Sequence, residues 1–129
     1  MKINVTAGDC LNEILQKRYP TKRFIPFREA MIKGGYSSSI FSPRFLEERA
    51  KVHGVTTSEY THNLKEVLDL LENVNKYQTI TLWFGEEPFC QANVKTLIQG
   101  LKDYGFKGEI ILNLVIEETG EIIQNQKIQ

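Results

Sequence analysis

The sequence predicts an α/β fold with three layers, in which a mostly parallel four-stranded sheet carries helices on both faces. Short runs rich in β-branched and aromatic residues alternate along the chain with segments whose apolar residues recur at helical spacing. Such alternation implies right-handed crossovers and a parallel sheet. Pro26 interrupts the second strand, and because proline cannot donate to a ladder, that strand belongs at an edge. The economical strand order is therefore 2-1-3-4.

Composition bounds the number of domains and excludes several classes of function. The chain has 129 residues, which favours one α/β domain over residues 1–117, followed by a candidate edge strand and a frayed C-terminal tail over residues 118–129. Lysine plus arginine and aspartate plus glutamate number 16 each, whereas domains that bind nucleic acid are usually basic. No apolar run reaches the roughly 20 residues of a membrane span, and no signal-peptide pattern is present. We therefore expect a cytoplasmic protein that binds neither nucleic acid nor membrane.

The cysteines and histidines do not form a metal-binding motif. His53 and His62 are not three or four residues apart, and neither is paired with Cys10 or Cys90 at zinc-ligand spacing. We expect no metal site. Each cysteine falls in the first turn of a predicted helix, where the dipole can activate a thiol, so a nucleophilic or redox role stays open. A buried, apolar role is favoured because free cysteine is among the most buried residue types.

The first half of the chain opens with a strand over residues 2–7 and a helix that ends before Pro20. Asp9 is the expected N-cap of this helix. The amides at the helix start also form a ready anion site, and a capping aspartate would repel an anion, so the two roles compete. A second strand follows over residues 22–27.

A long connection, residues 28–42, follows the second strand. It contains paired glycines and three consecutive serines. Connections of this length are often lids or binding loops, although glycine and serine also form flexible linkers. Two helices come next. One begins at Ser42-Pro43 and ends at Gly54, and the other is capped by Thr56 or Thr57 and runs to about residue 76.

The second half of the chain places a polar turn between a buried strand, residues 79–84, and a helix over residues 88–104. A fourth strand, residues 110–116, is apolar nearly throughout, as expected for a strand covered on both faces. A turn signal then precedes Ile122-Ile123, which can return as an antiparallel fifth strand at the edge.

This strand order, which is flavodoxin-like, brings two corners of the chain to one edge of the sheet. Ligands of such folds bind at the carboxyl ends of the strands, at the switch point between strands one and three. The Gly8 and Gly85 corners should meet there, with the 28–42 connection beside them. The candidate catalytic residues are two carboxylates, Asp9 and Glu87. The candidate ligand-binding residues are the glycine and the polar side chains expected around them: Gly8, Arg28, Glu29, Arg44, Glu86 and Gln91.

These residue types suit a small anionic or phosphorylated ligand. Two carboxylates held close together can share a proton, which is the arrangement that general acid or base catalysis uses. Arg28, Arg44 or Arg49 can clamp a phosphate or carboxylate with two donors, while Gln91 orients the ligand. Structural ion pairs with neighbouring acids account equally well for Arg28 and Arg44.

Three segments carry a resemblance to a known family: Gly8-Asp9, Phe27-Arg28-Glu29 with Gly34-Gly35, and most specifically Leu82 to Gln91. Across most of residues 3–101, the sequence resembles the bacterial domain-of-unknown-function family 1835. Members often have Gly-Pro where this chain has Gly34-Gly35, and many carry a second domain. The resemblance implies no established activity. It does imply that the family's recurrent polar residues fall on Gly8, Asp9, Arg28, Glu29, Glu87 and Gln91.

The expected function is that of an α/β domain that binds a small anionic or phosphorylated ligand at the C-terminal edge of the sheet, with hydrolysis of that ligand left open. The alternative is a regulatory or protein-interaction module without catalytic activity, working as a homodimer or beside a second domain. In that case the same residues would only pin loops together. No P-loop, nucleophile elbow or dinucleotide fingerprint appears, so the sequence identifies no cofactor and does not decide whether the protein is an enzyme.

Overall fold

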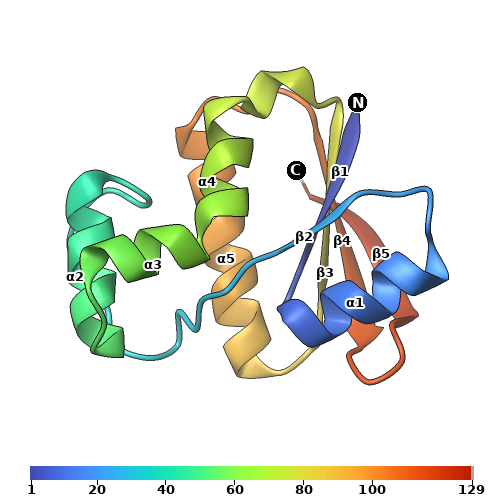
Figure 1. Ribbon diagram of the computed structural model, residues 1–129. Helices are drawn as coiled ribbons and strands as arrows, with labels where there is room; N and C mark the ends of the chain where they lie inside the picture. Colours follow the sequence, from blue (N-terminus) through green and yellow to red (C-terminus); the bar gives the residue numbers. More distant parts are fainter. Residues whose placement is uncertain (129) are drawn as a thin grey trace.

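The computed structural model describes residues 1–128, which contain a five-stranded sheet in the order β2-β1-β3-β4-β5 (Figure 1). The first four strands are parallel, and β5 is antiparallel to β4. This arrangement confirms the predicted α/β fold, the strand order and the antiparallel edge strand. The strand bounds are β1 (Lys2–Thr6), β2 (Phe24–Pro26), β3 (Thr79–Phe84), β4 (Glu109–Ile116) and β5 (Glu121–Ile128).

Five helices and one 3-10 turn connect the strands within the described residues. Their bounds are α1 (Asp9–Arg18), α2 (Pro43–His53), α3 (Thr57–Asn63), α4 (Lys65–Glu72), η1 (Val74–Lys76) and α5 (Pro88–Asp103). The single helix predicted from about residue 56 to residue 76 is wrong, because α3, α4 and η1 occupy this stretch. Leu64 separates α3 from α4 with φ −93° and ψ 5°. Its side chain is fully buried, so packing in the core stabilises the bend.

The last strand is longer than the sequence predicted. Residues 124–128 pair with β4, so the frayed tail expected there is wrong; Gln129 lies outside the described residues. The pairing rests on backbone hydrogen bonds, which polar side chains do not prevent. Asn125 even adds a side-chain hydrogen bond, donating from Nδ2 to Oδ1 of Asn113 at 2.5 Å. A β-bulge interrupts the register at Leu114/Val115.

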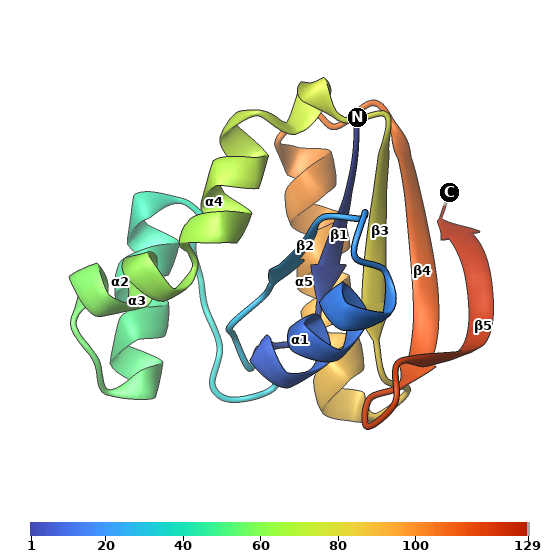
Figure 2. The ribbon, with the colours of Figure 1, turned by 45° about the vertical axis from the view of Figure 1, so that its right-hand side comes forward.

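The two faces of the sheet are covered unequally (Figure 2). Helices α4 and α5 lie on one face, with α2 and α3 farther out on the same side, while α1 lies alone on the other face. Right-handed crossovers explain the difference. The crossover from β1 to β2 moves one way along the sheet, and those from β2 to β3 and from β3 to β4 move the opposite way. Their helices therefore go to opposite faces.

Most of the hydrophobic core lies on the side of α4 and α5. The strands supply fully or almost fully buried side chains to it: Ile3, Val5, Ile80, Leu82, Phe84, Ile110 and Leu112. Each such side chain contributes about 1.5–3 kcal/mol of burial free energy. A smaller cluster lies beneath α1 and consists of Leu11, Leu15, Phe24, Trp83 and Val115. Most of the apolar burial that stabilises the sheet is therefore on the side of α4 and α5.

None of the helices in residues 1–128 combines the length and the apolar character that crossing a membrane requires.

Candidate functional site

Strands β1 and β3 end side by side, which brings the Gly8 and Gly85 corners to the same edge of the sheet. Thr6 pairs with Trp83, and the amide of Ala7 donates to the Trp83 carbonyl at 3.1 Å. Helices α1 and α5 begin directly after these corners, at the lower edge of the sheet in Figure 2. We refer to this region as the C-terminal edge.

Neither helix at the C-terminal edge is capped by a side chain. Gly8 is the N-cap of α1, and Asp9 is its first helical residue, so the prediction that Asp9 caps the helix is wrong. Glu87 is the N-cap of α5, and its carboxylate accepts no capping hydrogen bond. The first-turn amides of both helices therefore lack a side-chain acceptor, and water or a ligand can take that place.

Arg28 links α1 to α4 across the C-terminal edge. Its Nε donates to the two carboxylate oxygens of Asp9 at 2.9 and 3.1 Å. Its Nη1 donates to the carboxylate of Glu66 at 2.9 and 3.0 Å and to the Asn63 carbonyl at 3.2 Å. Partial burial opposes the charged form, but the hydrogen bonds with Glu66 and Asp9 outweigh it and raise the pKa of Arg28. These contacts agree with a structural role, in which Arg28 forms ion pairs with neighbouring acids.

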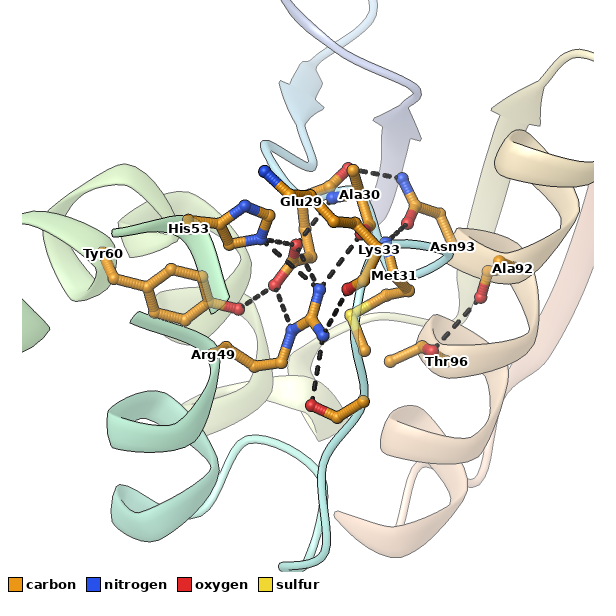
Figure 3. Close-up of polar contacts among 11 residues, drawn as sticks. Glu29, Ala30, Met31, Lys33, Arg49, His53, Tyr60, Ala92, Asn93 and Thr96 are labelled. Atoms are coloured by element: carbon orange, nitrogen blue, oxygen red, sulfur yellow. Dashed lines mark hydrogen bonds and ion pairs between the residues drawn. The ribbon is translucent and has the colours of Figure 1, made fainter. Parts of the chain in front are cut away.

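The Glu29 side chain does not lie at the C-terminal edge, where it was expected, but in a buried polar cluster (Figure 3). Its Oε1 accepts from Nη2 of Arg49 at 2.9 Å, from Nε2 of His53 at 2.5 Å and from the Ala30 amide at 2.6 Å. Its Oε2 accepts from Nε of Arg49 at 2.9 Å and from the Tyr60 hydroxyl. The carboxylate is 0% exposed, so no acceptor position is left for a ligand.

The charges of this cluster are stabilised by its hydrogen bonds. Burial works to raise the pKa of Glu29, but hydrogen bonds from Arg49 and Tyr60 outweigh it and lower that pKa. Burial and the hydrogen bond to Glu29 together raise the pKa of Tyr60, which keeps its hydroxyl a donor. The cluster therefore holds a carboxylate anion and a guanidinium cation side by side in the interior.

Arg49 ties α2 to the 28–42 connection. Besides Glu29, its guanidinium donates to the carbonyls of Lys33 at 2.8 Å, Gly35 at 3.2 Å and Ala30 at 3.0 Å. All five N–H donors of the side chain are used. The expected role of Arg49 in clamping a ligand does not fit this geometry, because its side chain is 0% exposed.

Two further side chains hold the same connection. Asn93 of α5 accepts from the Met31 amide at 2.8 Å and donates to the Glu29 carbonyl at 2.7 Å. Glu48 of α2 accepts from the Ser37 hydroxyl at 2.5 Å and from the Ser38 amide at 3.1 Å. The hydrogen bonds from Ser37 and Ser38 lower the pKa of Glu48 to about 2. The 28–42 connection is thus fastened to α2 and α5, and neither a lid nor a flexible linker describes it.

Arg44 does not join the C-terminal edge. It is an exposed residue in the first turn of α2, three residues after Phe41. The Phe41 carbonyl accepts from the hydroxyl of Tyr104, which follows the C-terminal end of α5. Glu87 lies at the other end of that 16-residue helix, about 24 Å away along its axis. The predicted clamp of Arg28 and Arg44 is therefore wrong.

The remaining predicted residues lie at the Gly85 corner. Glu86 and Glu87 are exposed. The Gln91 side chain donates from Nε2 to the Gly85 carbonyl at 2.9 Å, so it orients the turn. Within residues 1–128, no hydrogen bond joins Asp9 to Glu87, and Asp9 is directed at Arg28. The expected carboxylate pair is not formed.

The two cysteines differ in environment. Cys90 is 1% exposed, and burial raises its pKa to about 11, which agrees with the buried, apolar interpretation. Cys10 is exposed, so that interpretation is wrong for this residue. In the described part of the chain, no group of three or more histidine, cysteine, aspartate or glutamate side chains is arranged to hold a metal ion.

Comparisons of the chain with family models, with curated proteins and with solved structures gave no match. The resemblance to family 1835 accordingly stays a prediction from the sequence segments that carry it.

Proposed function

We propose that the protein binds a small anionic or phosphorylated molecule at its C-terminal edge. One observation carries the proposal: two helices without side-chain caps, α1 and α5, begin side by side at the ends of adjacent strands. Unpaired amides and the positive end of the helix dipole favour an anion at each start. Arg28 lies beside the start of α1, where it is paired with Asp9 and Glu66, and its guanidinium can bind an anion that replaces Asp9.

The Arg28–Asp9 ion pair would rearrange when an anion binds. The Asp9 side chain is 66% exposed and that of Arg28 is 34% exposed. Ion pairs at such exposure contribute roughly 0–1 kcal/mol, so an anionic ligand can replace Asp9 on the guanidinium at small cost. Glu66 would keep Arg28 in position during the exchange, because it holds the Nη1 group from α4.

Binding is better supported than hydrolysis. The predicted acid–base pair would need Asp9 and Glu87 close enough to share a proton. Asp9 is directed at Arg28, and no hydrogen bond joins it to Glu87 within the described residues. We therefore propose a binding function without an assigned reaction.

A regulatory or protein-interaction module is the second candidate. The observation that favours it is the use of Arg28 and Glu29 in contacts between elements. Arg28 joins α1 to α4, and Glu29 joins the 28–42 connection to α2 and α3. In this case the polar residues would position the surface loops that a partner contacts.

Titration of the isotope-labelled protein with inorganic phosphate, followed by the backbone amide signals, tests the binding proposal. We expect shifts at the first-turn amides of α1 and α5. Arg28→Gln should weaken binding about tenfold, because a hydrogen bond to a charged group is worth roughly 1.5–3 kcal/mol. Arg44→Gln is the matched control and should bind as the wild type does. An equal response of both variants, or no shift at either helix start, would contradict the proposal.

A further inference from the structure

Helix α1 covers only the part of its sheet face nearest the C-terminal edge, as both ribbon views show (Figure 1). A groove of about 680 Å³ lies over the uncovered part. Its base is formed by β1, β3 and β4, one wall by residues 19–23 after α1, and the other wall by β5. Ligand pockets in proteins have volumes of roughly 300–1,000 Å³, so the groove is large enough for a small molecule.

The base of the groove carries several polar side chains, which is unusual for parallel strands. Thr79 and Thr81 of β3 and Asn113 of β4 line it, beside the apolar Trp83 and Ile111. Parallel strands usually lie between two helical layers and carry apolar residues on both faces. The opposite face of these same strands follows that rule and packs its apolar side chains into the main core. The polar side chains are therefore confined to the face that no helix covers.

Among these polar groups, the side-chain amide of Asn113 is available to a ligand. Both polar atoms of the Asn4 side chain already have a protein partner, since Oδ1 accepts from the Trp83 indole at 2.9 Å and Nδ2 donates to the Arg23 carbonyl at 3.0 Å. The side chain of Asn113, a residue only 5% exposed, accepts one hydrogen bond at Oδ1, but its Nδ2 donates to no group in residues 1–128. No fully enclosed side-chain nitrogen or oxygen lacks a partner in that part of the chain. The Nδ2 hydrogens of the Asn113 side chain are consequently accessible from the groove.

The groove is also positively charged, although the chain as a whole has no net charge. Lys2 and Lys22 line it, and neither makes an ion pair within the described residues. Glu109 is the acidic residue of the described lining, and Lys127 neutralises it at 3.0 Å. An anionic occupant fits this distribution of charge.

Lys22 is held in place by an aromatic residue. Its Nζ lies 5.2 Å from the centroid of the Tyr19 ring. Arg23 also borders the groove, but its Nη1 donates to the hydroxyl of Tyr77 at 3.3 Å, and Tyr77 belongs to the hydrophobic core on the side of α4 and α5. The guanidinium of Arg23 is therefore directed away from the groove, and Lys22 is the cation of this wall.

We propose that this groove binds a phosphorylated sugar, either free or as part of a nucleotide. The phosphate would contact Lys2 and Lys22, and the sugar hydroxyls would exchange hydrogen bonds with Thr81 and Asn113 across the base. This site lies on a face of the sheet, apart from the C-terminal edge, so it does not depend on the function proposed there. A second copy of the chain is a poorer occupant, because a symmetric contact through this face would bring cations against cations.

The test is a titration of the labelled full chain with ribose 5-phosphate and, separately, with adenosine 5′-monophosphate. Either probe should shift the amide signals of Thr81, Asn113 and Asn125. Equal affinities would assign the recognition to the sugar phosphate, and tighter binding of the nucleotide would add a contribution from the base. Both outcomes support the proposal.

Matched variants sharpen the test. Lys22→Glu should weaken binding about tenfold, as expected for loss of one charged contact. Lys95→Glu makes the same charge change on α5, on the opposite side of the sheet, and should leave binding unchanged. Thr81→Val keeps the shape of the side chain and removes only its hydroxyl, so it should weaken binding without loss of fold. If that variant fails to fold, the comparison of Lys22→Glu with Lys95→Glu, both at exposed positions, still tests whether the groove binds the phosphate.

Three results would overturn the proposal. The first is the absence of shifts in the groove amides with millimolar amounts of both probes, and the second is an equal loss of affinity in Lys22→Glu and Lys95→Glu. The third is a dimer in sedimentation whose groove amides are protected from exchange. Arg28→Gln separates the two sites, because it should weaken phosphate binding at the C-terminal edge about tenfold and leave binding in the groove unchanged.

Discussion

Arg49 and Glu29 form a two-pronged ion pair from which solvent is excluded. The Nε and Nη2 groups of Arg49 each donate at 2.9 Å to a different oxygen of the Glu29 carboxylate, and both side chains are 0% exposed. The other donors of Arg49 bind backbone carbonyls of the 28–42 connection. The pair therefore fastens a long connection to α2 instead of contacting a ligand.

Replacing Arg49 should destabilise the protein strongly. Arg49→Met would leave the buried Glu29 carboxylate without its countercharge, and breaking a buried pair in this way costs about 3–5 kcal/mol. Arg44→Met changes an exposed arginine on the same helix and should alter the free energy of unfolding by less than about 0.5 kcal/mol. Urea unfolding of both variants measures the difference. Equal stabilities would show that the pair is not needed.

Glu29 should make stability depend on pH in the acid range. Its pKa in the folded protein is lowered from the ordinary value of 4.5, so its contribution to stability is fully present above that pH. The contribution is lost as the pH falls through the folded pKa, because the proton then binds the unfolded chain more tightly. The stability difference between the wild type and Glu29→Gln should therefore shrink below pH 4.5.

Urea unfolding at a series of pH values from about 7 to about 3 measures this difference. Glu47→Gln, an exposed change on α2, serves as the control and should show a small difference throughout. If the difference in the free energy of unfolding between wild type and Glu29→Gln stayed constant down to the lowest pH, the lowered pKa of Glu29 would be refuted.

The paired glycines of the 28–42 connection should respond differently to alanine. Gly34 has φ +65°, and a Cβ there would lie 2.7 Å from Cγ1 of Val52. The left-handed conformation alone costs a non-glycine residue about 1–2 kcal/mol, and the close contact adds to it. Gly35 has no atom within 4 Å of the corresponding position. Thermal unfolding should show Gly34→Ala clearly destabilised and Gly35→Ala close to wild type; the reverse order would be inconsistent with this backbone.

The two thiols should differ in reactivity. Cys10 is exposed, whereas Cys90 is 1% exposed and has a pKa raised to about 11 by burial. A thiol reagent at about pH 8 should modify Cys10 in the native protein and reach Cys90 only after unfolding, because the thiolate is the reactive form. Mass spectrometry of the modified peptides identifies the site, and Cys10→Ser should remove the fast reaction. Native-state modification of Cys90 at a comparable rate would be the contrary finding.

The topology was predictable because it depends on local patterns and on rules that hold for most α/β folds. Alternating strands and helices indicated parallel crossovers, and Pro26 at an edge then left one economical order. The same order predicted that the Gly8 and Gly85 corners would share an edge. None of these steps required knowledge of side-chain partners.

The partners of the charged residues were not predictable in the same way, because long side chains choose among several neighbours only after the helices have packed. Glu29 was expected at the C-terminal edge and instead binds Arg49. One signal was present in the sequence, since Arg49 follows Phe45 by one helical turn and thus falls on the apolar side of α2. A charged residue on that side indicates a buried pair.

The groove also had a signal that the sequence interpretation did not use. Thr79 and Thr81 alternate with Ile80 and Leu82 in β3. Such alternation is typical of a strand with only one apolar face, whereas the central strand was expected to be buried.

The sheet ends on each side in a strand whose outer backbone groups could recruit another polypeptide, and the two borders discourage this by different means. β2 has only three residues and includes Pro26, which offers no amide. β5 is long, but it carries the irregularity opposite Leu114/Val115 and charged side chains at Glu121 and Lys127. Straightening that strand and neutralising those charges would therefore promote fibre growth by strand addition, even if the monomer folded normally.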